Sequence, residues 1–73
     1  MPDKLTWLDS EDLAILLHEQ MPDVDPLTVR FTDLRDWVVK LAEFGDDPRA
    51  CNEAKLEAIQ MAWLEEYREA RGD

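Results

Sequence analysis

Residues 21–48, MPDVDPLTVRFTDLRDWVVKLAEFGDDP, decide the fold, because this stretch ends one helix and contains the whole of the next. Pro22 and Pro26 terminate the first helix, since the residue before a proline is driven out of the α region. Asp25 or Pro26 can then open a single helical turn. Residues 29–31 (VRF) indicate a short extended segment, because β-branched and aromatic side chains favour extended backbone.

The helix inside this stretch has the clearest amphipathic pattern of the chain. We expect it to cover about residues 33–44, with Thr32 as its cap and Gly45 just past its end in a positive-φ conformation. Apolar residues recur on one side every three or four positions: Leu34, Trp37, Val38, Leu41 and Phe44. The opposite side carries Asp33, Asp36, Lys40 and Glu43. The pattern therefore predicts one buried face and one charged, exposed face.

Two further helices are predicted on either side of this one. The first covers about residues 10–20 and is capped by Asp9 or Ser10, and the third covers about residues 52–70 and is capped by Asn52. We expect the three tryptophans in the core, with Trp7 the one to be partly exposed at an interface. The result is a single all-α domain over residues 1–73, mostly helical, with one or two very short extended segments.

The charge balance argues against several classes of function. The 73 residues include 18 acidic and 8 basic ones, for a net charge of −10. Such a surface is repelled by nucleic acid and by anionic membranes and is attracted to basic proteins. The single cysteine, Cys51, excludes an internal disulfide, and the sequence shows neither a signal peptide nor a membrane segment. We therefore expect a cytoplasmic monomer.

Paired carboxylates are the candidate metal ligands. A helix brings carboxylates three or four positions apart within reach of one cation, and Fe²⁺ accepts oxygen ligands, although carboxylates alone hold it weakly. The weak candidates are Asp9, Asp12, Asp23, Asp25, Asp33 and Asp36. The alternative is that these residues form solvated faces, helix caps and Asx-turns.

The remaining polar residues indicate structural roles rather than catalysis. The sequence has no Ser/His/Asp or Cys/His constellation and only two glycines, so we expect no enzymatic activity. His18 is expected to be solvated, Cys51 to be partly buried, and Arg30 to bridge to Asp33 or to the Asp46-Asp47 loop.

The order of these motifs resembles the IscX family of bacterial iron–sulfur cluster assembly proteins. The resemblance extends from Leu5 to Glu66 and rests on PDVDP at 22–26, VRFTDL at 29–34, Trp37, FGDDP at 44–48, NE at 52–53, LEAI at 56–59 and WL at 63–64. It implies a compact, winged-helix-like domain. Gly45 replaces an acidic residue that many members carry, and Cys51 replaces a serine.

The resemblance also implies a function. Members of the family resemble adaptors that bind and regulate a cysteine desulfurase through an acidic surface. They also bind iron weakly and exchangeably, as iron donors or sensors. Their role overlaps that of bacterial frataxin, so competition with a frataxin-type protein or with ferredoxin is implied.

The residues expected to contact the desulfurase are carboxylates on the first and second predicted helices and in the connection between them: Asp12, Glu19, Asp23, Asp25, Asp33, Asp36 and Glu43. An alternative function is a helix-turn-helix nucleic-acid-binding module, suggested by three short helices. An acidic mimic of nucleic acid is a further alternative that fits the charge.

Overall fold

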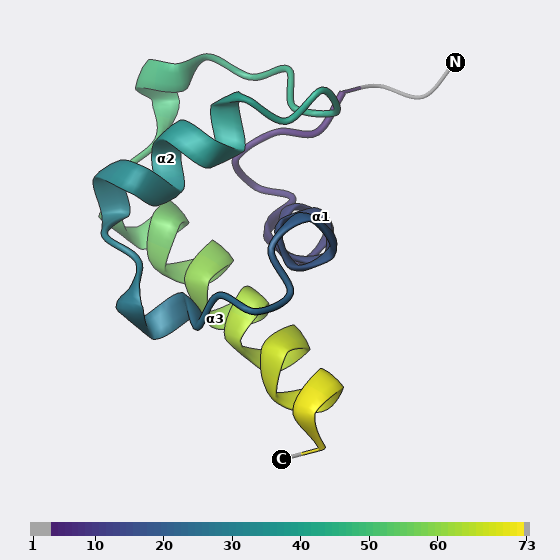
Figure 1. The fold of residues 1–73 in the computed structure, drawn as a ribbon. Coiled ribbons are helices and arrows are strands. Elements are labelled where there is room, and N and C mark those ends of the chain that lie inside the picture. Colours follow the sequence, from purple (N-terminus) through teal and green to yellow (C-terminus); the bar gives the residue numbers. More distant parts are fainter. Residues whose placement is uncertain (1–3, 73) are drawn as a thin grey trace.

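α1 spans Ser10–Gln20, α2 spans Phe31–Val39 and α3 spans Glu53–Arg71 in the computed structural model, which describes residues 4–72. α1 packs mainly against α3, and α2 lies across one end of the pair (Figure 1). The C-terminal turns of α3 extend beyond the other two helices (Figure 1). The predicted all-α class is confirmed.

The extended pieces of the chain are very short. Residues 4–72 contain no β-strand, and the pairing of Leu5 with Phe44 is an isolated parallel bridge. Val29 and Arg30 have extended backbone, as predicted, whereas Phe31 already belongs to α2. Two single turns of 3-10 helix complete the fold: η1 at Pro26–Thr28 and η2 at Pro48–Ala50.

The core is entirely apolar among the described residues. It contains side chains from all three helices and from the segments beside them: Trp7, Leu13, Ala14, Leu17, Leu34, Val38, Leu41, Phe44, Leu56, Ile59 and Trp63. No polar or charged residue of the described chain is buried. The predicted apolar face of the second helix is confirmed, because Leu34 and Val38 are fully buried and Trp37 packs against this cluster.

The prediction that Trp7 is the tryptophan partly exposed at an interface was wrong. Trp7 is 1% exposed, whereas Trp37 is half-buried. The Trp7 indole Nε1 donates a hydrogen bond of 2.7 Å to the Asp47 carbonyl oxygen, and the ring meets Phe44 edge-on with centroids 4.7 Å apart. An indole is buried at low cost when its N–H finds an acceptor, which explains why Trp7 is in the core.

The second helix begins and ends earlier than predicted. Arg30, not Thr32, occupies the N-cap position, and Thr32 lies inside α2. The helix ends at Val39, and separate turns follow in which the Leu41 N–H donates to Val38 and the Phe44 N–H donates to Leu41. Leu41 and Phe44 therefore reach the core from turns rather than from a continuous helix, although their spacing is helical.

Backbone hydrogen bonds join two segments that lie far apart in the sequence. We call residues 4–8 the N-terminal segment and residues 40–47 the α2–η2 loop. The Leu5 N–H donates to the Glu43 carbonyl oxygen at 2.8 Å, and the Gly45 N–H donates to the Leu5 carbonyl oxygen at 2.9 Å. Gly45 does not have the predicted positive φ, which belongs to Gly72 at the end of α3. A Cβ on Gly45 would overlap the side chain of Lys4, so the close approach of the two segments requires glycine here.

The caps of the helices are partly as predicted. Asn52 caps α3, because its Oδ1 accepts the Lys55 N–H at 2.8 Å. Asp9 occupies the N-cap position of α1 without capping it, since its carboxylate accepts the Thr6 N–H at 2.8 Å instead. Asp25 opens η1, as expected, by accepting the Leu27 N–H at 3.0 Å.

Replacing Asn52 with alanine should lower the free energy of unfolding by about 1 kcal/mol, because the substitution removes the cap acceptor of α3. Urea denaturation followed by circular dichroism measures this change. Asn52→Asp is the matched control, since aspartate retains an oxygen acceptor and should keep most of the stability. An equal loss in the two variants would contradict the capping role.

Candidate partner-binding site

The predicted site carboxylates fall into two groups by their hydrogen bonds. The half-buried Asp9 and Asp25 accept backbone N–H groups and therefore have local structural roles. The others are exposed: Asp12, Glu19, Asp23, Asp33, Asp36 and Glu43. Asp36 lies 4.0 Å from the Arg35 guanidinium, so its charge is partly compensated. The remaining five carboxylates make no ion pair with another described residue.

The six candidate metal ligands do not converge on one point. Two stand at the start of α1, two in the connection to η1 and two on α2. No group of three or more Asp, Glu, His or Cys side chains among residues 4–72 is arranged to hold a metal ion. The described residues therefore do not form a closed set of oxygen ligands of the kind that Fe²⁺ prefers.

Two expectations for single residues were wrong, and a third is confirmed. His18 is half-buried rather than solvated, and its Nδ1 is buried without a hydrogen-bond partner among the described residues. Arg30 is exposed and makes no ion pair with Asp33, with the Asp46-Asp47 turn or with any other described residue. Cys51 is half-buried and packs against the core, as expected.

Four carboxylates from α1 and α3 surround one depression, which we call the acidic hollow: Glu11, Asp12, Glu65 and Glu66. Its volume is about 250 Å³, and Ile15 and Ala62 complete its lining. None of the four carboxylates pairs with a cation among the described residues. The packing of α1 on α3 thus concentrates negative charge from two distant parts of the sequence.

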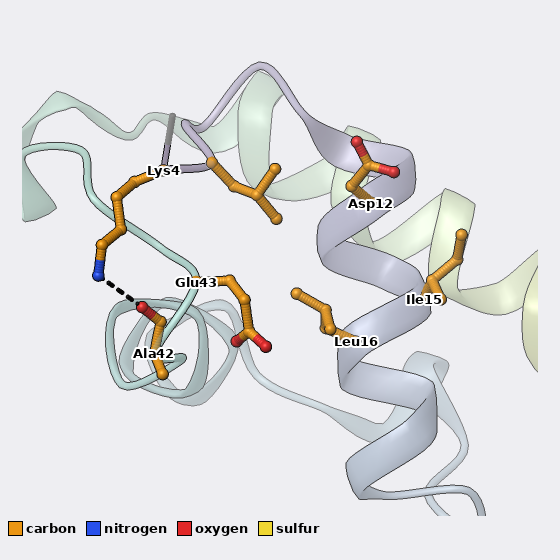
Figure 2. A pocket seen from close by; sticks show the side chains of 7 residues that line it. Lys4, Asp12, Ile15, Leu16, Ala42 and Glu43 are labelled. Atoms are coloured by element: carbon orange, nitrogen blue, oxygen red, sulfur yellow. Dashed lines mark hydrogen bonds between the residues drawn. The ribbon is translucent and has the colours of Figure 1, made fainter. Parts of the chain in front are cut away.

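A second and larger depression lies beside the acidic hollow, between α1, the N-terminal segment and the α2–η2 loop (Figure 2). We call it the apolar groove; its volume is about 510 Å³, and it is lined by Lys4, Leu5, Asp12, Ile15, Leu16, Ala42 and Glu43. Asp12 and Ile15 line both depressions, so the groove and the hollow are neighbours that share one wall.

Two carboxylates stand on opposite walls of the apolar groove. Asp12 projects from α1, and Glu43 projects from the α2–η2 loop toward Leu16 (Figure 2). Lys4 also lies at the rim, and its Nζ donates a hydrogen bond of 2.9 Å to the Ala42 carbonyl oxygen. The groove is therefore an apolar surface with acidic groups on both sides.

Sequence reasoning missed most of this surface. Of its residues, only Asp12 and Glu43 were predicted to contact a partner. Glu65 and Glu66 were missed because their proximity to α1 depends on helix packing, which no local pattern reveals. Ile15 did leave a signal, because it stands three residues after Asp12 on the polar side of the first helix.

A family model described as iron-sulphur cluster assembly matches residues 5–68, which include all of α1, α2 and most of α3. The chain belongs to the IscX family. A relative from Pseudomonas aeruginosa, described as an uncharacterized protein, is 56% identical over 62 residues. The alignment covers 85% of this chain and 94% of the relative.

Membership of the IscX family gives the chain a role in iron–sulphur cluster assembly, as an accessory protein rather than a member of a known enzyme family. The acidic hollow and all of the apolar groove except Lys4 lie within the range matched by the IscX family model. No helix in residues 4–72 is both long and apolar enough to cross a membrane.

Proposed function

We propose that this chain is an acidic adaptor and regulator of iron–sulphur cluster assembly, which binds a cysteine desulfurase in the cytoplasm. The observation that carries the proposal is the match to the IscX family over residues 5–68, combined with a carboxylate surface that the described chain leaves uncompensated. The chain acts by occupying the surface of the desulfurase, and its own residues perform no chemical step.

The electrostatics of the acidic hollow support this proposal. The chain has a net charge of −10, and four carboxylates of α1 and α3 share one hollow without a described cation between them. Concentrated like charges attract a basic patch over distances near the Debye length and increase the association rate. Lysine and arginine side chains of the desulfurase would relieve the repulsion among these carboxylates.

Iron, in this proposal, is an exchangeable cargo and not a resident cofactor. Because no three-ligand group exists among residues 4–72, Fe²⁺ would be held by carboxylate pairs such as Asp33 and Asp36, which are three positions apart on α2. Binding of this kind is weak and unselective. Competition of the desulfurase for the same carboxylates would then release the ion.

A nucleic-acid-binding role gains no support from α3, the helix that a helix-turn-helix protein would insert into the major groove of DNA. α3 exposes four glutamates along its length: Glu53, Glu57, Glu65 and Glu69. Phosphates would be repelled by this helix, since affinity for nucleic acid depends on lysine and arginine.

An NMR titration tests the proposed function. Adding the desulfurase to the ¹⁵N-labelled chain should shift or broaden the amide signals of Glu11, Asp12 and Glu65. The affinity should fall about tenfold between roughly 50 and 300 mM salt, because exposed charges are screened. No binding at low salt, or binding that salt does not weaken, would refute the proposal.

The same sample tests the view of iron as cargo. Fe²⁺ added under anaerobic conditions should perturb several carboxylate pairs gradually, with no saturation at one equivalent. A single tight site at one equivalent would show that a ligand set exists that the described side chains do not form.

A further inference from the structure

We propose that the apolar groove is the anchor site for one large apolar side chain of the partner, carried on a segment whose neighbouring residues are lysine or arginine. The inference rests on the proposed function and adds to it the chemistry of the contact. The negative charge of this chain would attract the basic partner to this face. The apolar side chain bound in the groove would then fix the position of the partner segment.

The apolar walls of the groove supply the first argument. Leu5 and Leu16 pack against the core on one side and line the groove on the other, whereas Ile15 is 40% exposed and contributes no side chain to the core. Ile15 stands on the acidic side of α1 between Glu11 and Glu19, where folding alone would favour a polar residue. An apolar residue placed there is explained by burial in a complex.

The charges at the rim decide the kind of occupant. Asp12 and Glu43 stand on opposite walls and make no ion pair with another described residue, so a cation beside the anchor could reach either one (Figure 2). Lys4, the cation of the lining, is held by the Ala42 carbonyl oxygen through its Nζ. An acidic or neutral segment would leave both carboxylates unsatisfied, whereas a basic one would pair with them.

The wall that the two depressions share extends this match to the acidic hollow. Because Asp12 and Ile15 belong to both linings, a lysine or arginine one turn from the anchor would lie over the acidic hollow. A second copy of this chain fits poorly, since each copy carries a net charge of −10 and would bring its own carboxylates to the rim. The occupant is therefore a basic segment of a different protein.

Calorimetric titration of the desulfurase with Ile15→Gln and Met61→Gln tests the anchor. Both residues are exposed aliphatic residues inside helices, at 40% and 51%, and Met61 lies outside the groove and the hollow. Ile15→Gln should raise Kd about fivefold through the loss of apolar area, whereas Met61→Gln should leave Kd unchanged. The salt dependence of Kd should stay as in the wild type, because no charge is removed.

The outcomes separate this inference from the proposed function. Wild-type affinity for Ile15→Gln, with salt-dependent binding retained, would overturn the anchor and leave the adaptor role standing. Equal weakening by Ile15→Gln and Met61→Gln would also overturn it. Failure of the wild-type chain to bind at low salt would refute the adaptor role itself. Analytical ultracentrifugation measures the oligomeric state of the chain. If the wild type were a dimer and Ile15→Gln a monomer, the groove would be a self-association site and the proposal would be overturned.

Discussion

Replacing Trp7 with alanine should lower the free energy of unfolding by about 3–5 kcal/mol, the usual cost of removing a large buried aromatic side chain. Trp7 is 1% exposed, meets Phe44 edge-on and donates to the Asp47 carbonyl oxygen. Small domains have a total stability of about 5–15 kcal/mol, so the variant should be largely unfolded at moderate urea concentrations. Urea denaturation monitored by circular dichroism measures the loss.

Trp7→Phe is the matched control for this prediction. Phenylalanine keeps an aromatic ring against Phe44 but cannot donate to Asp47, so it should cost about 1–2 kcal/mol. A loss below about 1 kcal/mol for Trp7→Ala would mean that the N-terminal segment unfolds separately from the helices. The hydrogen bonds of Leu5 and Gly45 would then be lost before the core opens.

Neutralising three carboxylates of the acidic hollow should weaken desulfurase binding about 30-fold, at about 0.7 kcal/mol for each charge. The variant is Glu11→Gln/Asp12→Asn/Glu65→Gln, and all three side chains are exposed and make no described ion pair. Each would meet a cation in the complex, so its removal reduces both the affinity and the salt dependence. Calorimetry at two salt concentrations measures both effects.

A second triple variant controls for net charge. Glu53→Gln/Glu57→Gln/Glu69→Gln also removes three exposed charges; it includes one acidic residue in the first turn of a helix, whereas the first triple includes two. These glutamates lie on α3 outside the acidic hollow, so binding should weaken only about twofold through the long-range field. Equal weakening by the two triples would mean that net charge, not the hollow, determines recognition.

The fold could be predicted wherever a local signal determined it. α1 was predicted at its observed bounds, and α3 was predicted to within a residue at each end, because the Asn52 cap and the glycine at position 72 are local features. α2 was predicted to begin two residues too late and to end five residues too late. Leu41 and Phe44 continue the helical spacing, but the pairing of Leu5 with Phe44 bends this part of the chain into turns. A contact between residues so far apart leaves no trace in a periodic pattern.

The candidate site was less predictable than the fold, for the same physical reason. Composition and the family resemblance indicated an acidic interaction surface, and Asp12 and Glu43 do lie on the groove. Glu65 joins Asp12 only because α1 crosses α3. Asp9 and Asp25 have the same side chain as the exposed aspartates, yet their carboxylates are occupied by backbone N–H groups. Packing and hydrogen bonding, rather than residue type, separate the two groups.

The hydrogen bond from Gly45 to Leu5 closes a ring of chain that holds α1 and α2, while α3 lies outside it. Closing a loop of about 40 residues costs roughly 3 kcal/mol of entropy. The ring holds the contact of Trp7 with Phe44, but α1 packs mainly against α3, which lies outside the ring. We therefore expect the ring to close stably only after α3 has left the ribosome during synthesis. The groove, which is lined by the N-terminal segment, and the hollow, which is lined by α3, would then be among the last surfaces to form.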